Sequence, residues 1–292
     1  MSEHELLTRD GRTLKVLERG DPAGRPVVVH HGMPNSRILS DADVASAQAR
    51  GIRLISYDRP GYGGSTPHPG RSIASCADDV RDIAAALGIE RLGTWGVSAG
   101  GPHALACAAL LPDLVAGAAV LASGAPWGAE GLDYFAGMGE LNAQDTLQVL
   151  QDPAAARRKC ESDRVEILAL SLEEVMEFMR TLLAPVDRAV FTGETGRHLL
   201  DSLRTGLAPG PEGWWEDEVS ELAPWGFELS AIRVPVLLLH GRHDRFVPFA
   251  HGEWLAAHIP GVEAILSDAD GHLTLTANHL DAVHDWLVDR LR

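Results

Sequence analysis

The 292-residue sequence is poor in cysteine and in basic residues, and each shortage excludes a class of protein. Its three cysteines, Cys76, Cys107 and Cys160, are odd in number and unevenly spaced, so we expect small buried thiols rather than a disulfide framework. Only 25 Lys and Arg stand against 41 Asp and Glu, a formal net charge of −16. Such an acidic chain is unsuited to phosphate backbones and anionic lipid, so we expect no nucleic-acid partner.

Long hydrophobic runs are missing as well. No stretch reaches the roughly 18 uninterrupted apolar residues of a membrane-spanning helix, and residues 1–15 lack the apolar core of a signal peptide. Together with the scarcity of cysteine, this favours a cytoplasmic location. His, Cys and carboxylate residues do not recur at the spacing of a zinc site, so no metal is expected.

The chain does contain a regular alternation of strand and helix patterns. It begins with a hairpin around the turn Asp10-Gly11. Continuous apolar runs, typical of strands buried on both faces of a parallel sheet, then alternate with helical patterns. The order predicts an α/β fold with a doubly wound, mostly parallel eight-stranded sheet and helices on both faces. The later strands are expected at 26–32, 52–58, 91–97, 114–124, 234–241 and 262–268, and the helices at 36–51, 75–88, 100–112, 248–259 and 278–291.

The alternation breaks after Pro126 and resumes near residue 229. In between, the pattern is helical and irregular without a convincing strand, with its clearest helix at 170–183 and a Pro/Gly loop at 209–218. This segment is therefore expected to be an insertion in the sheet fold. The predicted division is 1–126 for the first part of the core, 127–228 for a helical cap and 229–292 for the second part of the core.

The pentapeptide GVSAG (96–100) places Ser98 where a strand turns into a helix. Gly96 and Gly100 have no Cβ, so neighbouring backbone can approach closely and the serine can adopt a strained conformation. The side chain then projects at the carboxyl end of the sheet, where ligands bind in open α/β folds, and the new helix directs its free N–H groups there. This context predicts that Ser98 is a nucleophile.

A serine nucleophile needs a base, and the base needs an orienting acid. Asp244 follows the strand at 234–241, and His272 lies in a Gly-flanked turn after the strand at 262–268. The chain order Ser, Asp, His is that of α/β-hydrolases, and parallel strands bring all three residues to one end of the sheet. Among 13 histidines, His272 is the predicted base and Asp244 the predicted acid.

Other carboxylates compete with Asp244 for the role of the acid. Asp268 and Asp270 are so close to His272 in sequence that we interpret them as loop or turn residues. Asp133, which follows the strand at 114–124, is a more distant rival and remains open.

Acyl transfer also needs donors for the oxyanion of its transition state. The backbone N–H of Ala99, directly after the serine, is one predicted donor. The second comes from the turn HGMP (31–34), in which Gly32 shapes the turn and Met33 supplies the N–H. Pro34 has no N–H and cannot serve.

The expected cap is rich in aromatic and methionine residues, which either line an apolar pocket or pack the cap onto the sheet. Such a pocket, with no charge near the elbow, favours a small to medium neutral ester or lactone as the substrate. The residues predicted to line it are Trp127, Tyr134, Phe135 and Met138; Met176, Phe178, Met179, Trp214 and Trp215 are the further apolar candidates of the segment.

Taken together, these motifs resemble those of the α/β-hydrolase superfamily, in its cap-bearing branch of esterases, lipases, C–C bond hydrolases and aminopeptidases. The resemblance covers the whole chain except the cap. It implies a triad of Ser98, Asp244 and His272, an oxyanion hole at Met33 and Ala99, no cofactor, and a helical lid between the sixth and seventh strands. The motifs that carry it are HGMP (31–34), DRPGYGGS (58–65), GVSAGG (96–101), PVLLLHGRHDRFVP (235–248) and DGH (270–272).

Two departures narrow the branch. Haloalkane dehalogenases and epoxide hydrolases have Asp at the position of Ser98, and proline iminopeptidases usually have a Gly-Gly-Pro-Gly turn in place of HGMP (31–34). We expect a carboxylesterase-like serine hydrolase acting on a small molecule. A C–C bond hydrolase of a ring-cleavage product, an aminopeptidase or amidase, and a non-catalytic binding protein are the alternatives, and the oligomeric state is not predicted.

Overall fold

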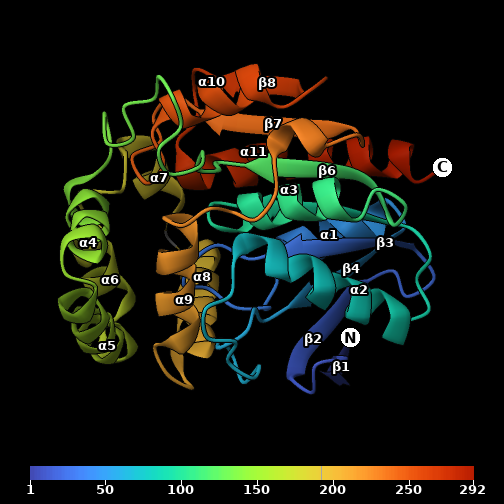
Figure 1. Cartoon of the computed structure of the whole chain (residues 1–292), viewed down its shortest axis with the longest axis horizontal. Helices are drawn as coiled ribbons and strands as arrows, with labels where there is room; N and C mark the ends of the chain where they lie inside the picture. Colours follow the sequence, from blue (N-terminus) through green and yellow to red (C-terminus); the bar gives the residue numbers. More distant parts are fainter. Residues whose placement is uncertain (192) are drawn as a thin grey trace.

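The computed structural model describes residues 1–191 and 193–292, so Thr192, within the expected cap, lies outside the described residues. Its eight strands form one sheet in the order β1-β2-β4-β3-β5-β6-β7-β8 (Figure 1). Only the β1–β2 and β2–β4 pairs are antiparallel. The strands are β1 (Ser2–Leu7), β2 (Thr13–Gly20), β3 (Arg25–His30), β4 (Ile52–Tyr57), β5 (Leu92–Val97), β6 (Val115–Leu121), β7 (Val236–Gly241) and β8 (Glu263–Ser267).

The central strands β3 to β7 are buried along most of their length, which is why their sequences are continuous apolar runs without a polar alternation. The predicted fold class is confirmed, including the opening hairpin and the six parallel-sheet strands.

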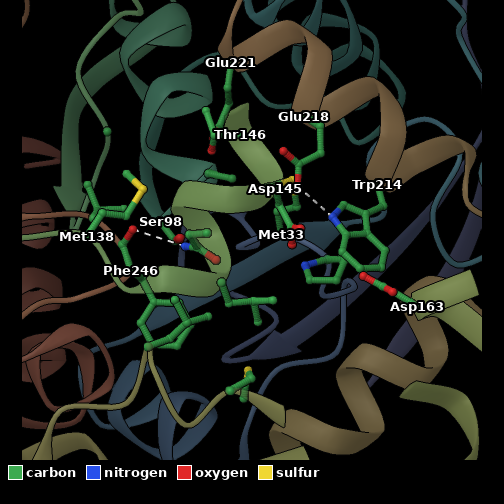
Figure 2. A pocket seen from close by; sticks show the side chains of 18 of the residues that line it. Met33, Ser98, Met138, Asp145, Thr146, Asp163, Trp214, Glu218, Glu221 and Phe246 are labelled. Carbon is green, nitrogen blue, oxygen red and sulfur yellow. Dashed lines mark hydrogen bonds between the residues drawn. The ribbon is translucent and has the colours of Figure 1, made fainter. Parts of the chain in front are cut away.

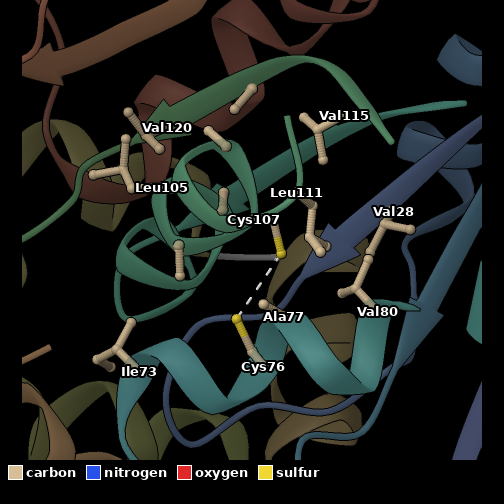
Figure 3. Packing of buried hydrophobic residues seen from close by; sticks show 14 of the residues in the cluster. Val28, Ile73, Cys76, Ala77, Val80, Leu105, Cys107, Leu111, Val115 and Val120 are labelled. Carbon is tan, nitrogen blue, oxygen red and sulfur yellow. Dashed lines mark hydrogen bonds between the residues drawn. The ribbon is translucent and has the colours of Figure 1, made fainter. Parts of the chain in front are cut away.

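Helices cover both faces of this sheet. Helices α2 (Cys76–Ala86), α3 (Gly100–Leu110) and α10 (Phe249–His258) pack on one face, and α1 (Asp41–Ala49) and α11 (His272–Arg290) pack on the other. Figure 3 shows the hydrophobic core on the face covered by α2, α3 and α10. In this core the Sγ atoms of Cys76 on α2 and Cys107 on α3 lie 3.9 Å apart. All three cysteines are buried free thiols, as predicted.

Between β6 and β7 the chain forms a helical insertion at one side of the sheet (Figure 1). No strand is assigned to its described residues, 127–191 and 193–228. Short 3-10 helices at Ile73–Ser75 and Leu229–Ala231 precede α2 and β7. The helices of the insertion are α4 (Glu140–Gln151), α5 (Pro153–Ala169), α6 (Leu172–Phe178), α7 (Pro185–Val190), α8 (Gly193–Leu207) and α9 (Glu212–Glu221).

The Pro/Gly loop expected at 209–218 is wrong from Glu212 onward, because α9 begins there. Pro211 precedes the helix at its N-cap, a position where a missing N–H costs nothing. Gly213 weakens a helix in isolation, but here it lets α9 approach the ring of Tyr62, which would lie 2.6 Å from an added Cβ. Tertiary packing has overridden the local propensity.

Three other helix boundaries differ from those expected by five residues or more. Helix α1 starts at Asp41 instead of residue 36, because the Ser40 hydroxyl accepts a hydrogen bond from Asp43 N–H at 3.0 Å and caps the helix. Helix α6 ends at Phe178 instead of residue 183. Helix α11 starts at His272, six residues before the expected 278, and this early start bears directly on the site described next.

Candidate active site

Ser98 lies at the junction of β5 and α3, with a φ of 55°. Its N–H donates to the Leu121 carbonyl on β6 at 2.9 Å, and its own carbonyl accepts from Gly101 N–H at 2.8 Å. A left-handed φ is strained for a residue with a Cβ and persists only where the surroundings impose it. The strand-to-helix turn therefore forces the Ser98 side chain out at the carboxyl end of the sheet.

Two glycines make this turn possible by close backbone approach. A Cβ on Gly96 would overlap the Gly100 carbonyl, and a Cβ on Gly100 would overlap the His30 carbonyl on β3. Gly32 is less constrained, because an added Cβ would meet the Ser98 Cβ at an ordinary 3.5 Å.

Asp244 lies in the loop that follows β7, next to His272, the first residue of α11 after the β8 loop. His272 Nδ1 donates to Asp244 Oδ2 at 2.7 Å, and the other carboxylate oxygen accepts from the N–H groups of Phe246 and Val247, each at 2.9 Å. Burial alone would lower the pKa of His272, but the charge and hydrogen bond of Asp244, with the charge of Asp187, raise it above its ordinary value. The pair is arranged to stabilise an imidazolium.

Ser98 lines a cavity, whereas Asp244 and His272 are not among the described residues that line it. Phe246 joins the pair to the cavity wall, because it lines the cavity and its ring stacks on the His272 imidazole with centroids 4.4 Å apart. Among the hydrogen bonds of the described residues, none joins the Ser98 hydroxyl to His272.

The rival carboxylates have other partners. Asp270 accepts hydrogen bonds from Ser267 and Asn278 and pairs with His279 at 2.8 Å. Asp268 pairs with Arg242, and Asp133 accepts from the N–H of Phe135 at 3.3 Å.

The two predicted oxyanion donors, Met33 and Ala99, line the same cavity as Ser98. The turn at 31–34 is closed by the Asn35 N–H, which donates to the Gly32 carbonyl at 3.0 Å. His31 supports it with Nδ1, 2.8 Å from the same carbonyl. Burial, with the charge of Arg59, holds the pKa of His31 well below its usual range.

Four carboxylates, which the sequence analysis did not single out, line part of the cavity: Asp145, Asp163, Glu218 and Glu221. Figure 2 shows the first three near the indole of Trp214, across the view from Met138 and Phe246. They come from helices α4, α5 and α9, which are far apart in sequence, so no local charge pattern marked the four as a group. The one available signal was the spacing of Glu218 and Glu221, which are three residues apart and so lie on one face of a helix.

Part of this acidic lining is neutralised within the protein. Lys159 lies 3.0 Å from Asp145 and also pairs with Asp163, and Trp214 Nε1 donates to Glu218 at 3.0 Å. Glu221 has no hydrogen bond or ion pair among the described residues. Burial, with smaller effects from nearby carboxylates, raises the pKa of Glu218 to about 7 and that of Glu221 to about 8. The cavity therefore has an apolar part and an acidic part.

The cavity encloses about 150 Å³ between the core and the insertion. Of the four residues predicted for the pocket, Tyr134 and Met138 line it. Trp127 and Phe135 are not among the lining residues and pack edge-to-face with Tyr134, at centroid distances of 5.0 and 5.6 Å. Apolar lining also comes from Phe178, Met179 and Trp214.

A second feature that sequence reasoning missed is the buried carboxylate of Asp217 on α9. It pairs with the guanidinium groups of Arg59 and Arg71 and accepts from the Tyr62 hydroxyl at 2.8 Å. Arg59 in turn donates to the His31 carbonyl. The insertion is thereby tied to the turn that carries Met33.

Residues 1–191 and 193–292 contain neither a metal-binding cluster nor a membrane-spanning helix. No three His, Cys, Asp or Glu side chains are grouped so that they could hold a metal ion. None of the helices combines the length and hydropathy needed to cross a membrane.

A mostly parallel eight-stranded sheet, a strained serine at a strand–helix junction and an Asp–His pair at the same edge together define an α/β-hydrolase fold. The chain belongs to the family described as alpha/beta hydrolase fold, whose model matches residues 25–276.

Relatives and solved structures agree with this assignment. The chain is 27% identical over 271 residues to the AB hydrolase superfamily protein YisY of Bacillus subtilis, covering 92% of each chain. It is 27% identical over 293 residues to a 2-hydroxy-6-oxononadienedioate/2-hydroxy-6-oxononatrienedioate hydrolase of Cupriavidus pinatubonensis, covering 98% of this chain and 94% of that one. The crystal structure of the esterase RhEst1 from Rhodococcus sp. ECU1013 superposes with a TM-score of 0.71 at 22% identity over both whole chains. The superposition shows the shared fold.

Proposed function

We propose that this α/β-hydrolase is a serine hydrolase that cleaves a carboxylic ester or lactone through an acyl-enzyme. Ser98 is the nucleophile, His272 the general base and Asp244 the acid that orients it. One observation carries the proposal. The strained Ser98 lines a cavity together with Phe246, and the Phe246 ring stacks on the imidazole of His272, which is paired with Asp244.

In the proposed mechanism, the Ser98 oxygen attacks the substrate carbonyl carbon while its proton passes to His272 Nε2. Asp244 holds the Nδ1–H, which leaves Nε2 free as the base and stabilises the imidazolium. The N–H groups of Met33 and Ala99 hold the tetrahedral oxyanion, each contributing roughly 3 to 4 kcal/mol. The imidazolium then protonates the leaving alcohol, and a water activated by His272 releases the acid and restores Ser98.

Residues 127–228 act as the cap in this proposal, over a core made of 1–126 and 229–292. The support is positional, since the cavity is lined from both sides, by Ser98 of the core and by residues such as Met138 and Phe178 of the insertion. The apolar part of the lining suits a small to medium ester.

The acidic part of the cavity favours a second candidate, an aminopeptidase or amidase acting on a substrate with an ammonium group. Within residues 1–191 and 193–292, Glu221 forms no hydrogen bond or ion pair, and a cation beside Glu218 and Glu221 would let both carboxylates ionise. C–C cleavage of a dicarboxylate such as the one in the name of the Cupriavidus relative is disfavoured, because no Lys or Arg is among the described residues that line the cavity to pair with it.

Hydrolysis of short and medium p-nitrophenyl esters tests the proposal. Ser98→Ala and His272→Ala should each lower kcat by about 10³-fold or more, since members of such a triad act as a unit. Ser230→Ala, at an exposed serine, is the matched control and should behave as the wild type. Full activity in Ser98→Ala would exclude this nucleophile, and a binding protein without catalysis would show no turnover in any variant.

A further inference from the structure

Helix α11 begins at His272, and the acceptor for its first N–H groups comes from the insertion. Asp187 on α7 is fully buried, and its carboxylate accepts from the backbone N–H groups of His272 at 3.0 Å, Leu273 at 2.8 Å and Thr274 at 3.1 Å. The first N–H groups of a helix have no partner within the helix, and a side-chain oxygen just before it usually supplies one. Here the oxygen comes from 85 residues earlier in the chain.

Gly271, the N-cap residue of α11, makes room for the Asp187 carboxylate. Gly271 has no side chain to cap the helix, and a Cβ there would collide with the Asp187 carboxylate. The Gly271 N–H donates instead to the Thr274 hydroxyl at 2.8 Å. Gly271 therefore leaves the space that Asp187 fills.

His272 is consequently held by two carboxylates from different parts of the chain. Asp244, after β7, binds the imidazole at Nδ1, and Asp187 binds the backbone N–H of the same residue. Two further titratable groups lie nearby: His240 on β7, whose Nε2 is 3.7 Å from Asp244 Oδ2, and His251, which interacts electrostatically with Asp244. Phe246 covers one face of the imidazole.

We propose that Asp187 is a positioning residue for the base: it fixes the backbone of His272 and makes the placement of the imidazole depend on docking of the insertion onto the core. The role of His272 as base rests on the proposed function. If α7 lifted from the core, Asp187 would leave, and the first turn of α11 would lose its acceptor together with a negative charge beside the imidazole.

The test compares Asp187→Asn with Asp201→Asn, an exposed carboxylate of the insertion that matches the change in charge. Asn keeps one acceptor oxygen but loses the other and the charge. We expect Asp187→Asn to lower kcat by about 10- to 100-fold with little change in KM, as for a displaced catalytic group. The acid limb of kcat/KM should move to lower pH by about half a unit or more, because a charge that raises the pKa of His272 is gone. Asp201→Asn should change neither.

The pKa of the imidazole is measured in parallel by NMR, on the His272 resonance identified by its absence in His272→Asn. This measurement needs no turnover, so it separates failure of the inference from failure of the proposed function. Gly271→Ala places a Cβ against the Asp187 carboxylate and should push it away from α11. This variant should show the same shift of the acid limb and the same shift of the His272 pKa. If Asp187→Asn does not fold, Gly271→Ala alone decides the test. A lower rate in either folded variant with an unmoved acid limb and an unmoved His272 pKa would reduce Asp187 to a structural role and overturn the inference.

Discussion

The carboxylate of Asp217 lies 2.6 Å from the guanidinium of Arg59, and neither side chain is exposed to solvent. Arg71 pairs with the same carboxylate, and burial, which would raise the pKa of Asp217, is outweighed by these two charges, which lower it. This buried ion pair joins α9 of the insertion to the loop after β4, and through the His31 carbonyl to the predicted oxyanion turn.

Removing one partner of this pair should strongly lower the stability of the fold. Asp217→Ala leaves Arg59 buried and unpaired, so we expect the free energy of unfolding to fall by about 3 to 5 kcal/mol. Urea denaturation measures it, with the exposed Asp201→Asn as a control expected to stay within about 0.5 kcal/mol. The double variant Arg59→Met/Asp217→Leu should lose less unfolding free energy than the sum of the losses in Arg59→Met alone and Asp217→Leu alone. Strict additivity of the two losses would contradict the coupling.

The elbow glycines give a steric prediction. Gly96→Ala and Gly100→Ala each place a Cβ on a backbone carbonyl, so both should unfold the elbow or abolish hydrolysis. Gly124 has open space around its Cα, and Gly124→Ala should keep wild-type thermal stability. Comparable melting temperatures and rates for all three variants would show that the turn is not as tight as described.

The pH dependence follows from His272. The proposed base, His272, works in its neutral form. Burial lowers its pKa, but Asp244 and Asp187 outweigh burial and raise the pKa above the ordinary 6.5. The value of kcat/KM should therefore fall as the pH drops, with its midpoint above 6.5. Asp244→Asn should move that midpoint to lower pH while lowering the rate by a factor on the order of 10⁴. An acid limb below 6.5 in the wild type would contradict the raised pKa.

Much of the fold and of the candidate site could be predicted because the signals were local. Apolar runs bounded by Gly and Pro marked β3 to β7, and GVSAG (96–100) marked the strained turn at Ser98. The spacing of Asp244 and His272 after consecutive strands predicted that they would meet, as they do at 2.7 Å. Their catalytic roles stay predictions until they are measured.

The rest depended on contacts that the sequence does not encode locally. Asp187 and Asp217 are single carboxylates in an irregular helical stretch, and their partners lie 85 and 158 residues away. The acidic lining draws on three helices whose packing fixes which carboxylates face the cavity. The Pro/Gly composition of 209–218 indicated a loop, whereas packing of Gly213 on Tyr62 made it a helix.

The acidic lining predicts discrimination by charge. With an aminoacyl p-nitroanilide that carries an ammonium group, Glu221→Gln should raise KM by about tenfold, the value of one charge-assisted contact of roughly 1.4 kcal/mol. The wild type and the variant are compared at one pH below about 7.7, where the ammonium group of the substrate keeps its proton. A neutral p-nitrophenyl ester should not show this effect. Equal KM changes for both substrates would favour an apolar ester as the natural class.

The central claim is that Ser98 is a nucleophile activated by His272. The most direct measurement is labelling with a fluorophosphonate probe followed by mass spectrometry of the digested protein. The account predicts one adduct per chain, on Ser98, absent in Ser98→Ala and formed far more slowly in His272→Ala than in Ser230→Ala. An adduct on another residue, or ester hydrolysis by a wild-type protein that the probe leaves unlabelled, would contradict it.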